Sequence, residues 1–373
     1  MAGVIVLILH PEPGRGAGPL ERWVGEARSE LADSHQAGFI AAGALDVRVV
    51  GGPPDDTPFG VRLRSFVESE RPSGLVVLGS GSIPLATASD RAAFLAAASS
   101  GRPDALTNNR FSADIVAVGR ADVLLGLPDL ASDNAVPRWL ADVAGCRVSE
   151  RRSRRLEIDI DGPLDLVLVG NRVLKGVAPQ TGVDLVAVRA ALDAVRGVAA
   201  NPRAELVIAG RTSASTIHWL ERNVAARVRA LVEERGLRSA TPAGAAIAPA
   251  AAIPPNRRLP RSLLGMLLDR DGPAALGSLL AEVGDAAVID TRVLLAHHLG
   301  GDERLWPAPE DRFASDLLLA DRVAYPWLRD LTRSAATAAI PILLGGHTLV
   351  GPGLRFAVRV GRRSPLPRAQ SRT

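Results

Sequence analysis

The sequence predicts an α/β protein, with a three-layer α/β/α domain built on a mostly parallel sheet and a second α/β domain after it. In the first half, short apolar runs alternate with helical periods, a pattern typical of parallel sheets covered by helices. A similar pattern resumes near residue 204, and 373 residues are enough for two domains of ordinary size. Hydrophobic residues make up 47% of the chain, which is enough for a buried core.

The first half contains three predicted strands, and a predicted helix follows each of them. The strands are residues 4–9, 46–50 and 74–78, and the helices cover residues 20–42, begin at Phe59 and cover residues 89–99. In open sheets of this kind, ligands bind beyond the carboxyl ends of the strands. The loops after these strands are therefore the places where functional residues are expected.

The loop after the first strand is rich in glycine and proline. Gly14, Gly16 and Gly18 would form a cradle in which backbone N–H groups approach phosphates closely, with Arg15 as the cation. The same composition is equally typical of a plain surface turn. The sequence leaves both interpretations open.

A second candidate lies near the end of the first half. Ile158 and Ile160 alternate with Asp159 and Asp161, which predicts a half-buried strand. The Gly-Pro pair that follows predicts the start of a helix, because proline fits the first helical turn. Asp161 is thus expected just before a helix N-terminus, either as its N-cap or as an outward-pointing metal ligand.

Two stretches together resemble the MobA-like nucleotidyltransferases, in particular the 2-phospho-lactate guanylyltransferase branch. The family's late Asp-x-Asp-Thr-Pro-x-Asp-Leu motif is matched by Asp159, Asp161, Pro163, Asp165 and Leu166, with Gly162 in place of threonine. Its earlier Asp-x-Pro-Leu-Leu-Thr-x-x-Asp motif is matched by Pro84, Leu85, Thr87 and Asp90, with Ser82 where the family has its metal-binding aspartate. The resemblance covers roughly residues 1–175.

The resemblance implies a nucleotide-diphospho-sugar transferase-like fold and an activity. The activity would be Mg²⁺-dependent transfer of a nucleotidyl group to a small phosphorylated or sugar-like acceptor, with Asp161 holding Mg²⁺ and Arg15 assisting. Thr107-Asn108 resembles a family segment near the base and ribose, although Asn108-Asn109 is also typical of a turn. The implied nucleotide contacts are Gly14, Gly16, Ser80, Ser82, Thr107 and Asn108.

Two departures from the family motifs support an alternative. Ser82 is neutral and a weak metal ligand, and no lysine follows the glycine-rich loop. The alternative is a catalytically degenerate protein that uses the same fold to bind a nucleotide or a partner. Residues 151–155 include four arginines, which would either bind phosphates or, more commonly, form a solvated surface.

The second half is expected to follow a helical linker. The predicted boundaries are residues 1–175, a linker at 176–203, a second domain at 204–358 and a disordered tail at 359–373. The second domain is predicted to contain strands that begin near residues 204, 286 and 340, a long helix at 214–234 and a loop at 239–260.

Polar residues end the three predicted strands of the second domain. They are Arg211, then Asp290 and Arg292, and finally His347. If the strands are parallel neighbours, these side chains converge at one edge of the sheet and form an anion or small-ligand pocket. Alternatively, Asp290 and Arg292 form a buried ion pair or a helix cap. His347 would then be a hydrogen-bonded histidine in a turn.

Composition excludes several classes of protein. The net charge is only +4, and the pI of 10.3 arises because Lys175 is the sole lysine among bases that are otherwise arginine. Aromatic residues at 3% are too few for a base-stacking surface, so nucleic acid is not an expected partner. One cysteine, Cys146, excludes an internal disulfide.

No apolar run is long enough to span a membrane, and the apolar start at residues 3–9 lacks the features of a signal peptide. A cytoplasmic protein with a nucleotide and a small-molecule acceptor as partners is expected. A homo-oligomer is compatible with the sequence.

Overall fold

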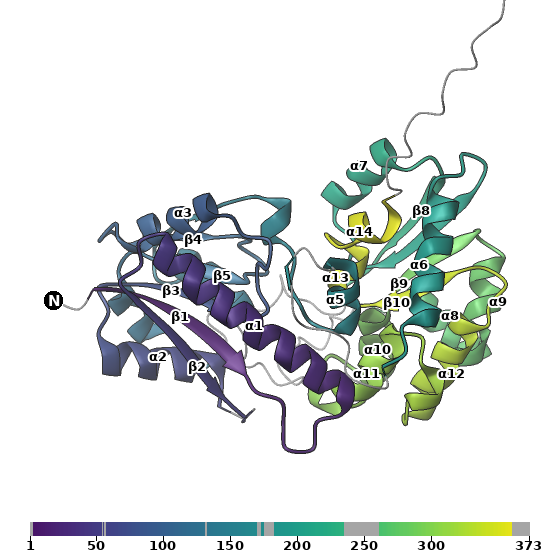
Figure 1. The fold of residues 1–373 in the computed structure, drawn as a ribbon, viewed down its shortest axis with the longest axis horizontal. Coiled ribbons are helices and arrows are strands. Elements are labelled where there is room, and N and C mark those ends of the chain that lie inside the picture. Colours follow the sequence, from purple (N-terminus) through teal and green to yellow (C-terminus); the bar gives the residue numbers. More distant parts are fainter. Residues whose placement is uncertain are drawn as a thin grey trace, which may run out of the picture. The chain divides into compact units, whose positions relative to one another are not determined.

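The computed structural model describes residues 3–53, 55, 57–130, 133–169, 173–174, 183–234 and 261–359. They form two compact units, the first ending at Val183 and the second beginning at Asp184 (Figure 1). Each unit contains a β-sheet with helices. The predicted class, two α/β domains, is confirmed.

The first domain begins with alternating strands and helices, as predicted. Its elements are β1 (Val4–Pro11), α1 (Pro19–Ala41), β2 (Asp46–Gly52), α2 (Phe59–Glu70), β3 (Gly74–Gly79), α3 (Ala88–Ala98), β4 (Asp104–Thr107), β5 (Ile115–Val118), η1 (Ala121–Gly126), η2 (Asp133–Ala135), α4 (Val136–Asp142), β6 (Arg147–Glu150), η3 (Arg154–Leu156) and α5 (Pro163–Val169).

The sheet of the first domain has six strands in the order β2-β1-β3-β5-β4-β6. β5 runs antiparallel to both of its neighbours, and the other five strands share one direction. The connection from β4 to β5 is short, and short connections join antiparallel strands because a parallel pair needs a crossover. The sheet is therefore mostly parallel, as the sequence predicted.

Helices cover both faces of this sheet and make it the middle layer of three. α1 and α3 pack on one face, where the core includes Phe39 and Phe94. α2, η1 and α4 lie over the other face, where Leu63, Leu124 and Trp139 are buried. Alternate residues of each strand point to opposite faces, so both faces of the central strands are apolar.

The second domain has a four-stranded, fully parallel sheet in the order β10-β9-β7-β8. Its elements are α6 (Val186–Ala199), β7 (Glu205–Gly210), α7 (Ala214–Asn223), β8 (Arg227–Val232), α8 (Leu263–Asp271), η7 (Pro273–Ala275), α9 (Leu276–Ala281), β9 (Ala286–Asp290), α10 (Thr291–Leu299), η8 (Glu303–Leu305), α11 (Pro309–Asp316), η9 (Ala320–Arg322), α12 (Pro326–Ala336), β10 (Ile342–Gly345), α13 (His347–Val350) and α14 (Leu354–Val358). α6, expected to be a linker, packs against β7, β9 and β10.

The long helix predicted for residues 214–234 is wrong. α7 ends at Asn223, and residues 227–232 form the edge strand β8. The sequence Arg-Val-Arg-Ala-Leu-Val alternates over its first residues, a strand pattern that the preceding helical period obscured. Likewise, the strand expected around Ile158 and Ile160 is reduced to one isolated bridge, between Ser82 and Asp159.

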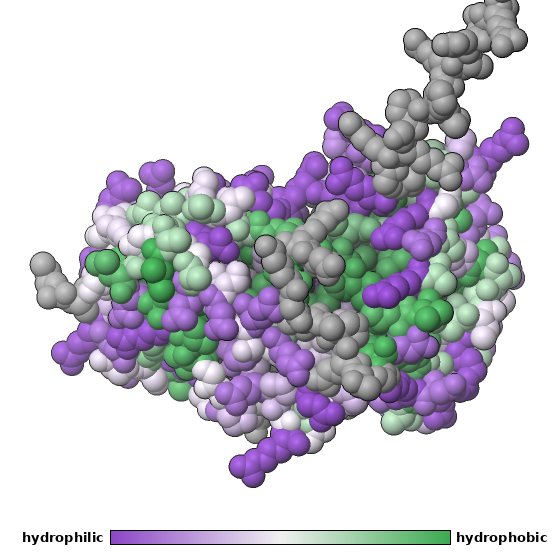
Figure 2. Space-filling view, viewed as in Figure 1, coloured by the Kyte–Doolittle hydropathy of each residue, from purple (hydrophilic) through white to green (hydrophobic). Residues whose placement is uncertain are grey.

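Three predicted regions lie wholly or partly outside the described residues: the loop at 239–260, the tail at 359–373 and the linker at 176–203. On the face shown in Figure 2, hydrophilic residues are spread over the first domain between smaller apolar areas. In the part of the chain that the structure describes, no helix combines the length and apolar character needed to cross a bilayer.

Candidate functional site

The turn after β3 joins the two stretches that carry the family resemblance. Ile83 N–H donates to the carbonyl of Ile158 at 3.1 Å, and Ile160 N–H donates to the carbonyl of Gly81 at 3.0 Å. Ser82 and Asp159 are thereby bridged through their backbones, and Ser82 is buried. The early and late motifs therefore meet at the carboxyl edge of the sheet, the edge where open α/β sheets bind ligands.

Ile83 holds this turn in an unusual backbone conformation. Its φ is 45°, in the left-handed region that β-branched residues rarely adopt, and its side chain is fully buried. Such a conformation costs about 1–3 kcal/mol and persists only where the surroundings impose it. Strain of this kind clusters at ligand-binding turns, which makes residues 79–83 a candidate for that role.

Two side chains of α1 donate hydrogen bonds to the backbone of the bridge. His35 donates from Nε2 to the carbonyl of Ser82 at 2.8 Å, and Arg28 donates from Nε to the carbonyl of Ile160 at 2.8 Å. They lie seven residues apart, which places them on the same face of the helix. One helix thus fixes both halves of the bridge.

His35 is kept neutral by its surroundings. It is almost completely buried, and burial together with the nearby charge of Arg91 lowers its pKa to about 4. Its Nδ1 has no hydrogen-bond partner among the described residues. A neutral imidazole protonated on Nε2 accounts for the bond to Ser82.

His10 and Ser80 connect the ends of β1 and β3. His10 Nδ1 and Ser80 Oγ are 3.0 Å apart, and Ser80 N–H donates to the carbonyl of Leu9 at 2.8 Å. Burial lowers the pKa of His10 despite the opposing charge of Glu12. Ser80, an expected nucleotide contact, is buried in this arrangement and serves to join the strands.

Carboxylates gather around the bridge. Burial and the neighbouring carboxylates of Asp161 and Asp114 raise the pKa of Asp159 well above its usual value. Asp161 is 62% exposed, and its Oδ1 lies 3.6 Å from Nη2 of Arg28. Asp161 does not cap α5: Oδ2 of Asp165 accepts the N–H groups of Asp161 and Gly162, at 2.9 and 2.8 Å.

A magnesium site can be tested against these residues. Among the residues that the structure describes, no three histidine, cysteine, aspartate or glutamate side chains are placed to hold a metal ion. Asp161 faces the guanidinium of Arg28, and the position of the family's other metal ligand is the neutral Ser82. Mg²⁺ is usually held by one or two carboxylates together with substrate phosphates, so an ion at the bridge would depend on Asp161 and on the phosphates of a bound nucleotide.

Thr107 and Asn108 use their polar groups within the chain. Thr107 Oγ1 donates to the carbonyl of Ile115 at 2.9 Å, and Asn108 Nδ2 donates at 2.7 Å both to Asp114 Oδ2 and to the carbonyl of Leu156. Both side chains are buried. They shape the connection from β4 to β5 and fix the carboxylate of Asp114.

A pocket of about 180 Å³ opens beside that carboxylate. It lies at the carboxyl ends of β1 and β3 and the start of β5, and its wall is mainly apolar, with Asp114 and Asp133 as its charged members. The remaining lining residues are Leu9, Pro11, Phe59, Val77, Leu78, Gly79, Ala113, Ile115, Val116 and Val136. The position agrees with the edge predicted to bind ligands.

The glycine-rich loop is an open turn at the same edge. Ala17 N–H donates to the carbonyl of Gly14 at 2.9 Å, and Gly14, Arg15 and Gly16 are exposed. A Cβ added at Gly14 or Gly16 would meet no atom of the described residues within 4 Å. The loop follows β1, so it is available to a ligand at this edge, but no described contact draws Arg15 toward the bridge.

The arginine run at 151–155 has a partner that the sequence did not reveal. Arg151 donates from Nε to Asp90 at 2.7 Å, and Arg155 donates from Nε and Nη2 at 2.6 and 2.9 Å. Asp90 is fully buried and forms a capping box with Thr87 at the start of α3. Two of the four arginines are therefore bound to Asp90, and a third, Arg152, donates to Glu150 at 2.8 Å.

Replacing Asp90 with asparagine is expected to destabilise the first domain by about 2 kcal/mol, because charged hydrogen bonds from two arginines are weakened. Burial tends to raise the pKa of Asp90, but Arg155, Thr87 and Arg151 outweigh it and hold the pKa well below its usual range. Urea unfolding checks the loss. Asp122→Asn, in an exposed pair with Arg120, is the control, and equal losses in both variants would contradict the prediction.

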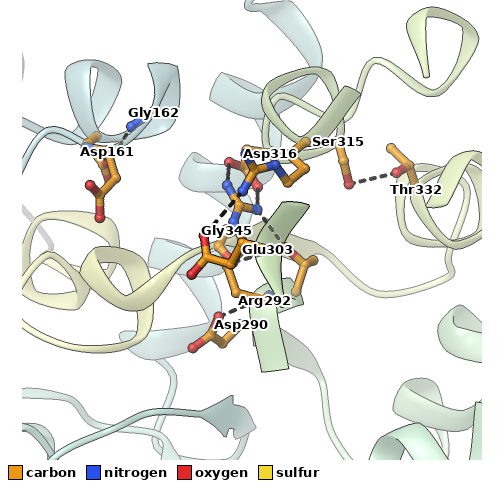
Figure 3. Close-up of polar contacts among 12 residues, drawn as sticks. Asp161, Gly162, Asp290, Arg292, Glu303, Ser315, Asp316, Thr332 and Gly345 are labelled. Carbon is orange, nitrogen blue, oxygen red and sulfur yellow. Dashed lines mark hydrogen bonds and ion pairs between the residues drawn. The ribbon is translucent and has the colours of Figure 1, made fainter. Parts of the chain in front are cut away.

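The strand ends of the second domain carry two ion pairs. Arg211 donates from Nε and Nη2 to Asp290 at 2.6 and 3.0 Å. Arg292 donates to Asp316 with both terminal nitrogens at 2.6 Å (Figure 3). Asp290 also accepts the N–H of Arg292 at 3.1 Å, which caps α10.

The charges of these residues influence one another. Burial tends to raise the pKa of Asp290, but Arg211, His347 and Arg292 lower it, and the net pKa lies below the usual value. For Asp316, burial dominates over the attraction of Arg292, and the pKa is raised. The structure thus brings together the four residues expected at this edge and adds Asp316.

Comparison with known proteins does not assign a family. No family model matches the chain, and a search of curated proteins finds no significant match.

Proposed function

We propose that the first domain binds a nucleotide at the carboxyl edge of its sheet, in the manner of a nucleotidyltransferase that has not kept its metal centre. The observation that carries this proposal is the bridge between Ser82 and Asp159 beside the pocket at the ends of β1 and β3. It joins the two motifs shared with the resembling family at the edge where such folds bind ligands.

The pocket suits a nucleobase. Pockets for drug-sized ligands measure roughly 300–1,000 Å³, so a volume of about 180 Å³ fits a base but not a whole nucleotide. Apolar walls favour a flat ring, and the carboxylates of Asp114 and Asp133 accept hydrogen bonds from N–H groups. Guanine offers such donors on its Watson–Crick edge, and the resembling branch uses guanine nucleotides.

The residues of the site support nucleotide binding alone better than they support catalysed nucleotidyl transfer. Nucleotidyl transfer uses Mg²⁺ to neutralise phosphate charge, and carboxylates usually hold the ion. Here Arg28 faces Asp161, and Ser82 offers a buried hydroxyl in place of a carboxylate. The phosphates would meet Arg28 and the open loop with Arg15 instead.

GTP is therefore expected to raise the melting temperature by the same amount in Mg²⁺ and in EDTA, and more than ATP, CTP or UTP does. A ligand at 100 times its Kd adds about 2.7 kcal/mol to stability. Asp114→Asn should reduce the preference for GTP over ATP, because one carboxylate acceptor is lost. Asp33→Asn, an exposed aspartate on α1, is the control.

Turnover separates the two functions. We expect no release of pyrophosphate from GTP with Mg²⁺ or Mn²⁺ and phosphorylated acceptors. Pyrophosphate release that Asp161→Asn abolishes would establish a transferase and refute the proposal of binding alone. If no nucleotide raised the melting temperature, neither nucleotide binding nor nucleotidyl transfer would be supported.

A further inference from the structure

The second domain has its own ligand edge, independent of the nucleotide proposed for the first. From β7 the chain crosses through α7 to β8 on one side, and from β9 it crosses through α10, α11 and α12 to β10 on the other. β7 and β9 are therefore adjacent strands whose connections diverge. In open parallel sheets, ligands bind at the carboxyl ends of such a pair.

Two nearly buried arginines stand at this point. Arg211 follows β7 and Arg292 follows β9, and each side chain is only 11% exposed. Each guanidinium is fixed by two hydrogen bonds to a buried carboxylate, Asp290 for Arg211 and Asp316 for Arg292. Figure 3 shows the pair of Arg292 and Asp316. Arg292 also donates from Nη1 to Oγ1 of Thr291 at 2.8 Å. The Nη1 of Arg211 takes no part in the bonds to Asp290 and has no acceptor among the described residues.

Stability alone does not explain two such pairs. A buried ion pair costs desolvation that its attraction repays only in part, and apolar side chains of similar volume are often as stable. Guanidinium groups held in fixed orientation are well suited to oxyanions, because their donors match the spacing of carboxylate and phosphate oxygens. The carboxylates then act as supports that orient the arginines.

Among the described residues, little stands close to the backbone beside Arg292. Gly346 follows β10, and a Cβ built there would meet only one described atom within 4 Å, Nε of Arg292 at 3.9 Å. The backbone of Gly346 has φ −102° and ψ −161°, an extended conformation that any residue adopts. Glycine is therefore not required here by the backbone, and its missing side chain leaves the approach to Arg292 open.

We propose that this edge binds an oxyanion, the phosphate or carboxylate group of a small molecule, against Arg211 and Arg292. The proposal joins three independent observations: the divergence of the strand connections, the two oriented arginines and the open space at Gly346. α13 lies over the same edge, where Thr212 Oγ1 donates to the carbonyl of Val350 at 3.0 Å.

The test fills the space without removing a charge. Gly346→Leu places a side chain beside Arg292, and Gly301→Leu, where a Cβ meets no described atom within 4 Å, is the matched control. Inorganic phosphate is titrated into the full chain by calorimetry at low millimolar concentration and constant ionic strength, because concentrated phosphate stabilises folded proteins generally. Acetate is titrated separately to distinguish a carboxylate from a phosphate.

We expect Gly346→Leu to weaken phosphate or acetate binding at least about tenfold, which corresponds to about 1.4 kcal/mol, while Gly301→Leu binds like the unmodified protein. Arg211→Lys, which keeps the charge but loses the planar fork, should weaken binding as well and serves if Gly346→Leu does not fold. Neither substitution should alter the rise in melting temperature that GTP causes. Equal binding in all variants, or no binding of either anion to the unmodified protein, would overturn the proposal.

Discussion

Asp290→Asn is expected to lower the free energy of unfolding of the second domain by about 3–5 kcal/mol. The carboxylate is fully buried and accepts two hydrogen bonds from the guanidinium of Arg211, one from the backbone N–H of Arg211 at 3.4 Å and one from the backbone N–H of Arg292. Asparagine keeps the shape but removes the charge. The guanidinium of Arg211 would then remain buried without a counterion.

The same pair gives stability a pH dependence. The pKa of Asp290 in the folded domain is below its usual value, so the unfolded chain binds a proton first as the pH falls. The contribution of Asp290 is complete above about pH 4, the usual aspartate pKa, and is lost as the pH falls toward the folded pKa. Asp290→Asn should remove this part of the acid sensitivity.

A surface pair in the same domain provides a close control. Asp302 accepts two hydrogen bonds from the guanidinium of Arg304 and one from its backbone N–H, so it also combines a bidentate arginine with a backbone donor, but it is exposed. Asp302→Asn should cause a much smaller loss, because solvent screens the pair. Urea unfolding gives the losses, and hydrogen exchange in β9 assigns them to the second domain. Losses of equal size would show that burial does not strengthen the Asp290 pair.

Acidification is expected to destabilise the first domain through His35. Its pKa is about 4 in the folded domain, because burial and Arg91 oppose the charged form, against about 6.5 in an unfolded chain. Between these values the unfolded chain binds a proton that the folded domain does not. Stability is therefore full above about pH 6.5 and falls by about 3 kcal/mol as the pH approaches 4.

His35→Gln isolates this contribution. Its side-chain amide can still donate to the carbonyl of Ser82, but it does not titrate. The unfolding free energy of His35→Gln should fall less steeply between pH 6.5 and pH 4 than that of the unmodified protein. His218→Gln, at an exposed histidine on α7, should keep the full dependence. Parallel pH curves for His35→Gln and the unmodified protein would disprove a neutral, buried His35.

Local patterns predicted the first domain well. The strands that begin at Val4, Asp46 and Gly74 and their helices appear within two residues of the expected boundaries, because apolar periodicity reports burial directly. β8 was missed, because six residues of alternating sequence after a helix carry little signal. Asp161 was a reasonable N-cap by residue type, but the helix start is held by Asp165, whose Oδ2 accepts the N–H groups of Asp161 and Gly162.

The candidate sites show which contacts a local sequence pattern cannot predict. Parallel strands place Arg211 and Asp290 at one edge, and topology alone was enough to expect them there. The roles of Arg28 and His35 depend on carbonyl groups that lie far away in the sequence, so no local pattern indicates them. A polar pair at seven-residue spacing on an otherwise apolar helix face was the available signal.

The bridge between Ser82 and Asp159 also bears on the order in which the chain folds. Residues of β1, α1 and β3 are synthesised early, but the hydrogen bonds to Ile158 and from Ile160 form only after the ribosome has released almost the whole first domain. Contacts between segments so distant in the chain form late, because the long loop between them must first close at a cost in chain entropy. A nascent chain truncated before residue 158 therefore lacks the assembled edge, even though most of its sheet has been made.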